Sequence, residues 1–292
     1  MRRLSFKSRC RLRAALVLVS AVALAGCWRA APTRVEWTAM GTVAAVQYAD
    51  NRDVPLGDVA RRCTALEFDI VENLLNAHDP SSEISRLAAA PDETVLARCD
   101  VRMRPCYAAA FGLMRASGGA FNPRWKGPDG LDLGAIAKGF AVDRADEAFS
   151  DFKRKDGWRM LVDLGGNVKS VKGTWRTGVL DPSGEGFAAV VDLQEGEALA
   201  TSATYYRGGH IVDGRTGAVV SNGVASVTVL CRSALWADGL STTLFVLGPD
   251  EGRRFLSEGK LPAEAPSDVS ALWILENGNH VTYGSHARFQ GN

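Results

Sequence analysis

The sequence has little net charge and no long apolar run. Its 292 residues include 34 Lys and Arg against 33 Asp and Glu, which gives a formal net charge of +1. A nucleic-acid-binding protein needs a basic face, so this balance gives no support for a nucleic-acid partner. No stretch reaches the roughly 18 apolar residues that a membrane-spanning helix requires. Repeats, heptads and low-complexity tracts are also missing, which leaves one large globular domain or two ordinary ones.

Cysteine and histidine are scarce, with six and four residues. No cysteines show CxxC or Cys/His zinc spacing, so the sequence does not favour a thiolate metal site. Beyond the first 27 residues four cysteines remain, an even number that permits two disulfides in any of three pairings in an oxidising compartment. Four buried free thiols are the alternative, and the sequence leaves both open. These cysteines are Cys63, Cys99, Cys106 and Cys231.

Residues 1–26 have the pattern of an export signal. Six positive charges and no negative charge surround the start of an apolar run over residues 14–24, and Leu-Ala-Gly-Cys follows at residues 24–27. A charged segment, an apolar segment and a small-residue cleavage site are typical of a secretory signal peptide. The cysteine position resembles a bacterial lipobox, which implies cleavage before Cys27 and lipid attachment to it. An ordinary signal with an incidental cysteine, or a short interfacial helix, is the alternative, and Arg2-Arg3 only faintly suggests a twin-arginine signal.

Removal of this segment changes the charge of the protein. It leaves 28 of the 34 basic residues against all 33 acidic ones, a net charge near −5. We therefore divide the chain into a lipoprotein signal peptide (1–26), a lipidated tether (27–34) and a folded domain (35–292). The expected location is the bacterial cell envelope, facing the periplasm and anchored by lipid. Trp28, in place of an Asp, favours the outer membrane.

The apolar periodicity predicts an α+β fold with largely antiparallel sheet, because strands and helices do not alternate strictly. Helices are expected over residues 56–76, 84–90, 103–116, 136–149 and 234–247. Ser81 or Ser82 is expected to cap the second of these helices, Ser233 the last, and Gly248-Pro249 to end the last. Strands are expected over residues 35–48, on both sides of Gly165-Gly166 within 160–175, and over 177–180, 188–193, 224–231, 271–276 and 279–283.

The first of four polar motifs, residues 132–139, combines an acid, a glycine turn and a helix start. Exposed N–H groups and the positive end of a helix suit a phosphate. Asp132 would repel phosphates, so it is better placed to bond sugar or base atoms or to lie near a cation. A plain turn with a helix cap is the alternative.

The fourth motif, residues 237–242, places Asp238 and Thr242 one helical turn apart on one face. Their neighbours are apolar, and an unpaired aspartate among them would be costly. A Mg²⁺ ion with a carboxylate and a hydroxyl among its six ligands would resolve that cost. An aspartate bonded to a nearby cap or arginine is the alternative.

The other two motifs are less specific. Residues 163–167 contain a Gly-Gly pair that is most simply a hairpin turn. Residues 201–217 form the densest polar cluster, in which His210 and Asp213 could serve as a base and its orienting group. A structural histidine beside a turn is the alternative for His210.

In this order the four motifs resemble the FAD:protein FMN transferase (ApbE-type) family of exported, often lipid-anchored flavin transferases. Residues 40–42 (MGT), 82–87 (SEISRL) and 247–248 also match, so the resemblance runs from Met40 to Gly248. It implies a T-fold-like α+β architecture with packed helices and FAD bound between its halves. The sequence departs from the family pattern at Asn122, where the family has Asp, at His78, where a Tyr is expected, and in a short 121–132 segment.

The resemblance also implies an activity, which is transfer of the FMN part of FAD to a Thr or Ser of an exported redox protein with release of AMP. FAD and Mg²⁺ are the implied substrate and metal. An FAD pyrophosphatase that gives FMN and AMP, and a non-catalytic flavin-binding lipoprotein, are the alternatives. The implied roles are FAD binding for Met40, Gly119, Ala120, Phe121, Asp132, Lys138, Thr201 and Ser202, Mg²⁺ binding for Ala135 (through its carbonyl), Asp238 and Thr242, and general base for His210.

Overall fold

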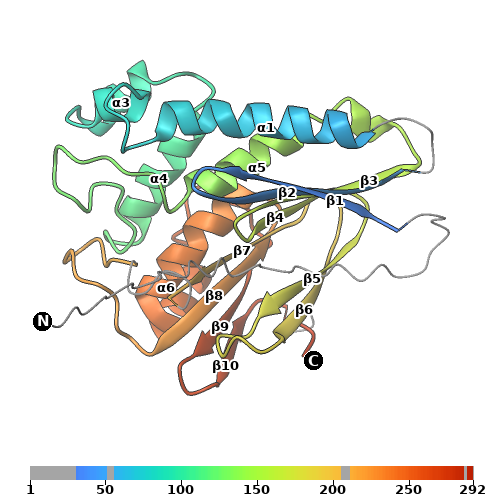
Figure 1. The fold of residues 1–292 in the computed structure, drawn as a ribbon. Coiled ribbons are helices and arrows are strands. Elements are labelled where there is room, and N and C mark those ends of the chain that lie inside the picture. The colour runs from blue at the N-terminus through green and yellow to red at the C-terminus, as the bar shows by residue number, and fades with distance from the viewer. Residues whose placement is uncertain (1–30, 51–55, 205–210, 286–287, 292) are drawn as a thin grey trace, which may run out of the picture.

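A computed structural model of the chain describes residues 31–50, 56–204, 211–285 and 288–291. The predicted signal peptide, the lipidated Cys27 and the candidate base His210 lie outside the described residues. Within them the fold has three layers, a helical layer, a large sheet and a small hairpin (Figure 1). No described helix is long and apolar enough to cross a membrane.

The large sheet of the described region is antiparallel throughout, with the strand order β1-β2-β3-β4-β7-β8-β9-β10. The predicted α+β fold with largely antiparallel sheet is therefore confirmed. The strands are β1 (Thr33–Ala39), β2 (Thr42–Asp50), β3 (Trp158–Leu164), β4 (Asn167–Lys172), β7 (Ala198–Ala203), β8 (Val224–Cys231), β9 (Ser270–Leu275) and β10 (His280–Tyr283).

Three long helices pack against one face of this sheet. α1 (Leu56–Leu75) contacts β1 and β2, α5 (Ala137–Glu147) contacts β3 and β4, and α6 (Ala234–Ser257) contacts β4, β7, β8 and β9. The helices α2 (Glu83–Leu87), α3 (Asp92–Arg98) and α4 (Arg104–Ala116) extend the helical layer at one end (Figure 1). A 3₁₀ turn, η1, spans Phe152–Arg154.

The hairpin of β5 (Trp175–Leu180) and β6 (Phe187–Leu193) covers part of the opposite face. Successive side chains of a strand point to opposite faces, so each central strand supplies both cores. In β3, Met160 and Val162 face the helices while Leu161 joins the hairpin core, and in β9 Trp273 faces the helices while Leu272 and Ile274 face the hairpin. Burial on both faces explains why β3 and β8 have almost no exposed residues.

α6 is anchored at its first turn by a carboxylate of α5. Asp143 accepts hydrogen bonds from Ser233 Oγ (2.6 Å) and from the backbone N–H groups of Ala234 (2.9 Å) and Leu235 (3.0 Å). The buried Lys169 Nζ completes the cluster at 2.7 Å from Asp143. Ser233 is the N-cap, as the sequence predicts, and Gly248 (φ 72°) breaks the helix at the predicted place. A second helical stretch continues beyond it.

Four details of the predicted elements are wrong. The strand expected over residues 35–48 is two strands, because Met40 (φ 48°) and Gly41 (φ 69°) turn the chain back on itself. Two elements were not predicted, β7, whose central residues Ala200 and Thr201 are small, and α3, which has no side-chain cap. β1 also begins at Thr33, two residues inside the segment assigned to the tether.

The four cysteines of the described region are free. Cys99, Cys106 and Cys231 are buried, and Cys63 is partly exposed. Of the two alternatives left open by the sequence, the structure has the free thiols.

Candidate active site

The first and fourth motifs meet where α5 and α6 cross. The Gly139 N–H donates to Asp238 Oδ2 at 2.9 Å. A Cβ on Gly139 would lie 2.1 Å from the Ala234 carbonyl oxygen and 2.6 Å from the Asp238 Cβ. Only glycine allows this approach, which brings the start of α5 against the first two turns of α6.

Asp238 is a buried carboxylate with one close cation. Lys138 Nζ lies 3.6 Å from Asp238 Oδ2. Burial raises the pKa of Asp238 above its ordinary value, while Lys138, the Gly139 N–H and the Asn167 side chain act in the opposite direction. Buried carboxylates with a shifted pKa occur often at functional sites, because burial of an ion is costly.

The third motif joins the same cluster through Ser202. Ser202 Oγ lies 2.8 Å from Ser241 Oγ and 3.1 Å from Thr242 Oγ1. Thr201 points to the other face of the sheet, where its Oγ1 lies 2.8 Å from Thr228 Oγ1 across the β7–β8 pair. Of these two candidate FAD-binding residues, only Ser202 lies beside the Asp238 cluster.

Asp132 lies on the same approach to α5. Its Oδ1 accepts from the Gly134 N–H at 2.9 Å, and its Oδ2 from Lys126 Nζ at 2.8 Å. Burial alone would raise the pKa of Asp132, but these two partners outweigh it and hold the pKa below the ordinary value. Lys138 Nζ donates to the Gly134 carbonyl at 3.3 Å, so one turn links Asp132 with Lys138. Ala135 lies in this turn, just before α5.

Met40 is held at the edge of the site by α1. Its φ of 48° is the one positive value for a non-glycine residue in the described chain, and its N–H donates to Glu72 Oε2 at 2.9 Å. The Gly165 N–H donates to the Val43 carbonyl at 2.9 Å, which places the second motif beside this turn. The second motif, residues 163–167, forms the predicted hairpin turn between β3 and β4. Its last residue, Asn167, lies close to Asp238.

Residues 119–121 touch the later part of the third motif rather than the Asp238 cluster. The Ala120 carbonyl accepts from the Gly214 N–H at 3.1 Å, and Asn122 Nδ2 donates to the Gly214 carbonyl at 3.0 Å. Ala120 and Phe121 have buried side chains, so mainly their backbone is available to a ligand. Asp213 pairs with the Arg215 guanidinium through both oxygens (2.8 to 3.1 Å), which makes it a turn residue here.

The donor set around Asp238 suits a hard cation. No group of three or more His, Cys, Asp and Glu that could hold a metal occurs among the described residues. Asp238, Thr242 and Ser202 instead offer one carboxylate and two hydroxyls, all oxygen donors, which Mg²⁺ prefers. A single carboxylate does not neutralise a divalent ion. The set therefore fits a Mg²⁺ ion that shares its remaining positions with water and with phosphates of a ligand.

A groove next to Asp132 was not foreseen from the sequence. It runs between the segment after α1 and the 121–132 loop, and its lining includes His78, Ser85, Ala88, Lys126, Asp129 and Leu131. Arg124 lies beside it and bonds both sides. No local pattern could have identified Arg124, because most of its partners are backbone carbonyls distant in sequence.

The segment that matches a known family contains most of the residues around Asp238. The model of the ApbE family matches residues 126–265, which include Asp132, Lys138, Ser202, Asp238 and Thr242. The match covers a little under half of the chain, so the likeness to the ApbE family is established for this region.

Curated relatives that match this chain are named FAD:protein FMN transferase. The protein from Klebsiella pneumoniae (strain 342) is 33% identical over 156 residues, which cover 50% of this chain and 46% of that protein. The protein from Vibrio cholerae (strain O395) is 33% identical over 148 residues, 45% of this chain and 43% of that protein. The matched region thus spans about half the length of these relatives.

Solved structures show the same fold. The flavin transferase ApbE from Vibrio cholerae superposes with a TM-score of 0.69 at 20% identity, over 88% of this chain and 98% of that one. The apo form of the Pseudomonas stutzeri flavinyl transferase ApbE gives a TM-score of 0.68 at 23% identity, over 88% and 95% of the two chains. The architecture expected from the resemblance is therefore confirmed.

Proposed function

We propose that this protein transfers the FMN part of FAD to a Ser or Thr hydroxyl of an exported redox protein and releases AMP. The observation that supports it most is the buried carboxylate of Asp238. It accepts a hydrogen bond from the Gly139 N–H, lies 3.6 Å from Lys138 Nζ and is one helical turn from Thr242. All four residues belong to the segment that matches the family model. The names of the curated relatives point to the same reaction.

FAD is proposed to lie along the start of α5. The pyrophosphate would meet the N–H groups and the positive end of this helix, with Lys138 as the nearest cation. Asp132, already bonded to Lys126, is placed for sugar or base atoms rather than for phosphate. Met40, the backbone of residues 119–121 and Ser202 would complete the binding surface, with Thr201 supporting Ser202 from within β7.

Mg²⁺ is proposed to bind Asp238, Thr242 and the Ala135 carbonyl. When bound, it would supply positive charge that offsets the negative charge of the reacting phosphates. Lys138 neutralises part of the Asp238 charge before the ion arrives.

The acceptor hydroxyl oxygen is proposed to bond to the FMN-side phosphorus as the bond to the AMP oxygen breaks. His210 would accept the proton of the hydroxyl, a role worth about 10²–10⁴ in rate for a well-placed base. Water is the competing acceptor, and its attack would make the same site an FAD pyrophosphatase that gives FMN and AMP.

The proposed location is the periplasmic side of the bacterial envelope. Cleavage before Cys27 and lipid attachment would leave the residues from Cys27 to the start of β1 at Thr33 as a tether and the rest of the chain as the catalytic domain, with the outer membrane favoured by Trp28. An exported acceptor would share this compartment.

One assay separates the candidate functions. The purified protein is incubated with FAD, Mg²⁺ and a candidate acceptor, and AMP and protein-bound flavin are followed. Transfer gives AMP and a fluorescent flavin band that survives denaturing electrophoresis. Hydrolysis gives FMN and AMP without acceptor, and a flavin-binding protein without activity binds FAD but releases no AMP. A complete lack of AMP would overturn both enzymatic functions.

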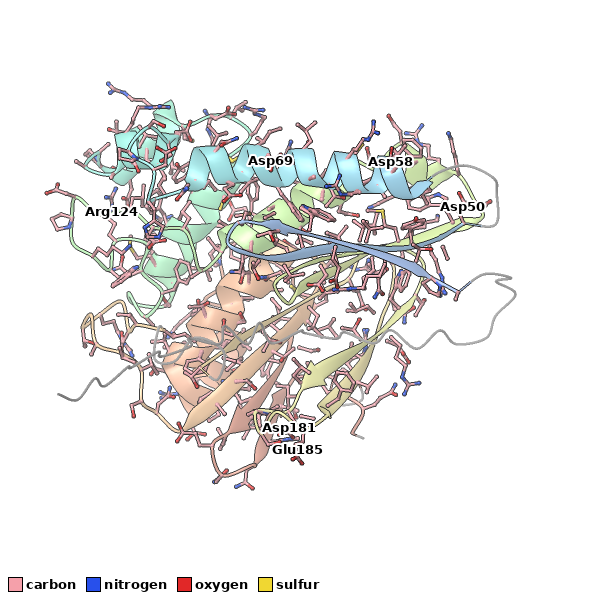
Figure 2. All side chains as sticks on the ribbon, viewed as in Figure 1. Asp50, Asp58, Asp69, Arg124, Asp181 and Glu185 are labelled. Carbon is pink, nitrogen blue, oxygen red and sulfur yellow. The ribbon has the colours of Figure 1, made fainter. Side chains whose placement is uncertain are left out.

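Asp238→Ala is predicted to abolish Mg²⁺-dependent AMP release, because it removes the single carboxylate of the donor set. Asp181→Ala is the matched control, since Asp181 lies in the β5–β6 turn far from the site (Figure 2). The control should retain wild-type turnover. Full turnover in Asp238→Ala would contradict the metal assignment.

A further inference from the structure

Arg124 binds four acceptors in two segments, residues 88–92 and its own 121–132 loop. Its Nε donates to Asp92 Oδ1 at 2.9 Å, and its Nη2 to the Ala90 carbonyl at 2.6 Å. Its Nη1 donates to the Ala88 carbonyl at 2.6 Å and to the Pro128 carbonyl at 2.9 Å. The side chain is 15% exposed, and its guanidinium also lies over the Phe111 ring, 5.9 Å from the centroid.

These contacts join the two sides of the groove beside Asp132. Ala88 belongs to the side that includes His78 and Ser85, while Pro128 belongs to the loop whose Lys126, Asp129 and Leu131 form the other side. Figure 2 shows Arg124 at this end of the molecule, below α3 and beside α4. The distance between the two sides is therefore set by one planar group.

The same loop leads directly to the candidate site. Lys126 is two residues from Arg124 and bonds Asp132, and the Asp132 N–H donates to the Pro123 carbonyl at 2.8 Å. The Asn122 Oδ1 accepts from the Arg124 N–H at 2.8 Å, so the loop is fixed on both sides of Arg124. Any shift of the guanidinium would move Lys126 and Asp132 together.

We propose that Arg124 is a positioning residue for FAD, which fixes the width of the groove and holds the loop that presents Lys126 and Asp132. This inference rests on the proposed function of the same site. The segment between Phe121 and Asp132 is short and contains two Pro and two Gly among its loop residues, with no strand or helix of its own. A single side chain that bonds across it supplies the order that secondary structure would otherwise give.

An arginine is required for this geometry. Its guanidinium presents donors in a rigid plane, whereas a lysine ammonium is one nitrogen on a flexible stem. Arg124→Lys keeps the charge but cannot bond Asp92, Ala90 and Pro128 at once. The variant is expected to weaken FAD binding about tenfold, since displacements near 1 Å at a binding constellation cost about that or more.

The test measures FAD affinity by flavin fluorescence, with Mg²⁺ present, on wild-type protein and Arg124→Lys. The dissociation constant and the KM for FAD should rise about tenfold, while kcat changes less than about twofold, because the groups at the phosphorus remain in place. Asp92→Asn keeps an acceptor for Arg124 but removes the negative charge. It should raise the dissociation constant for FAD by only about two- to threefold.

Arg144→Lys is the matched control. Arg144 is similarly buried and bonds Glu67 through Nε (3.1 Å) and Nη2 (2.8 Å), but it joins α5 to α1 away from the groove. It should lower the Tm and leave the FAD affinity unchanged. The inference would be overturned if wild type and Arg124→Lys bound FAD equally well. It would also be overturned if Arg124→Lys and Arg144→Lys both lost FAD affinity in proportion to their losses in Tm. A wild-type protein that does not bind FAD would overturn the proposed function, and this inference with it.

Discussion

Two aspartates near the site differ in their electrostatic surroundings. Asp132 is bonded by Lys126 and by the Gly134 N–H, and its pKa is lowered. Asp163, in the second motif, is more deeply buried, and burial raises its pKa despite Arg34 at 3.2 Å and the Gly166 N–H at 3.0 Å. The contribution of Asp132 to stability is therefore lost as the pH falls, whereas that of Asp163 is lost as the pH rises.

Asp163→Asn is predicted to flatten the pH dependence of stability. Burial holds the folded-state pKa of Asp163 above the ordinary value of 3.8, so the unfolded chain releases this proton first as the pH rises. The stability that the protonated form supplies is present below pH 3.8 and is lost as the pH rises through the folded pKa. The Tm of the variant relative to wild type should therefore increase from pH 4 to pH 7 in thermal unfolding.

The control for this measurement is Asp181→Asn. The backbone and side chain of Ser183 lower the pKa of Asp181, so its substitution should not give the same trend. If the difference in Tm between Asp163→Asn and wild type does not change with pH, burial does not control the titration of Asp163.

The sequence indicates some residues of the site better than others. Asp238 and Thr242 could be found because two polar residues one helical turn apart stand out among apolar neighbours. Arg124 and Glu72 could not be found, because Arg124 mostly bonds backbone carbonyls and Glu72 bonds the N–H of Met40. The identity of a backbone partner leaves no trace in the side-chain pattern.

At the scale of elements, the crossing of α5 and α6 sets the geometry of the site. Gly139→Ala is predicted to lower both stability and Mg²⁺-dependent AMP release, because a Cβ would lie 2.1 Å from the Ala234 carbonyl oxygen. The helices would have to separate, and the hydrogen bond from the Gly139 N–H to Asp238 would lengthen. Chemical denaturation should show a loss of about 1–3 kcal/mol, the usual cost of overpacking.

Gly112→Ala in α4 is the matched control. Its Cβ would meet only the Pro262 side chain, at 3.0 Å, and an alanine favours a helix by about 1 kcal/mol over glycine. This variant should keep wild-type activity and nearly wild-type stability. A Gly139→Ala protein with unchanged activity would show that the α5–α6 distance does not matter for the site.

Helices and strands could be predicted from the sequence where a single spacing of apolar residues, helical or alternating, runs through the whole element. α1 follows its apolar spacing to within one residue, and β8 matches its β-branched run. The alternation over residues 35–48 predicts one strand, because it continues across a turn that only the backbone conformation at Met40 and Gly41 reveals. β7 has a single large apolar residue, Leu199, which faces the hairpin core, and its helix-facing positions Ala198, Ala200 and Ser202 are small. Its sequence therefore does not show the alternation that predicts a strand.

At the scale of the whole molecule, the proposed cleavage before the lipid anchor also changes the net charge of the protein. The domain beyond residue 26 is mildly acidic, so in the proposed function Lys138, Lys126 and a helix start would have to attract the anionic FAD without a basic surface. Cys27→Ser is predicted to release the protein from the membrane fraction while preserving its fold. Fractionation with labelling by a radioactive fatty acid would measure both the location and the lipid.

Cys10→Ser is the matched control, because Cys10 lies within the segment proposed to be removed. It should not alter lipid labelling or membrane association. Continued fatty-acid labelling of the Cys27→Ser protein would contradict lipid attachment at this residue.

The candidate site draws on Met40 in the first hairpin turn, Lys138 in α5, Ser202 in β7 and Thr242 in α6. Neighbouring strands of the sheet join these segments across most of the sequence, so no short fragment contains the site. A nascent or partly unfolded chain therefore has no place for FAD. Flavin affinity consequently reports that the fold is complete, and ligand addition should protect all layers of the protein from proteolysis together.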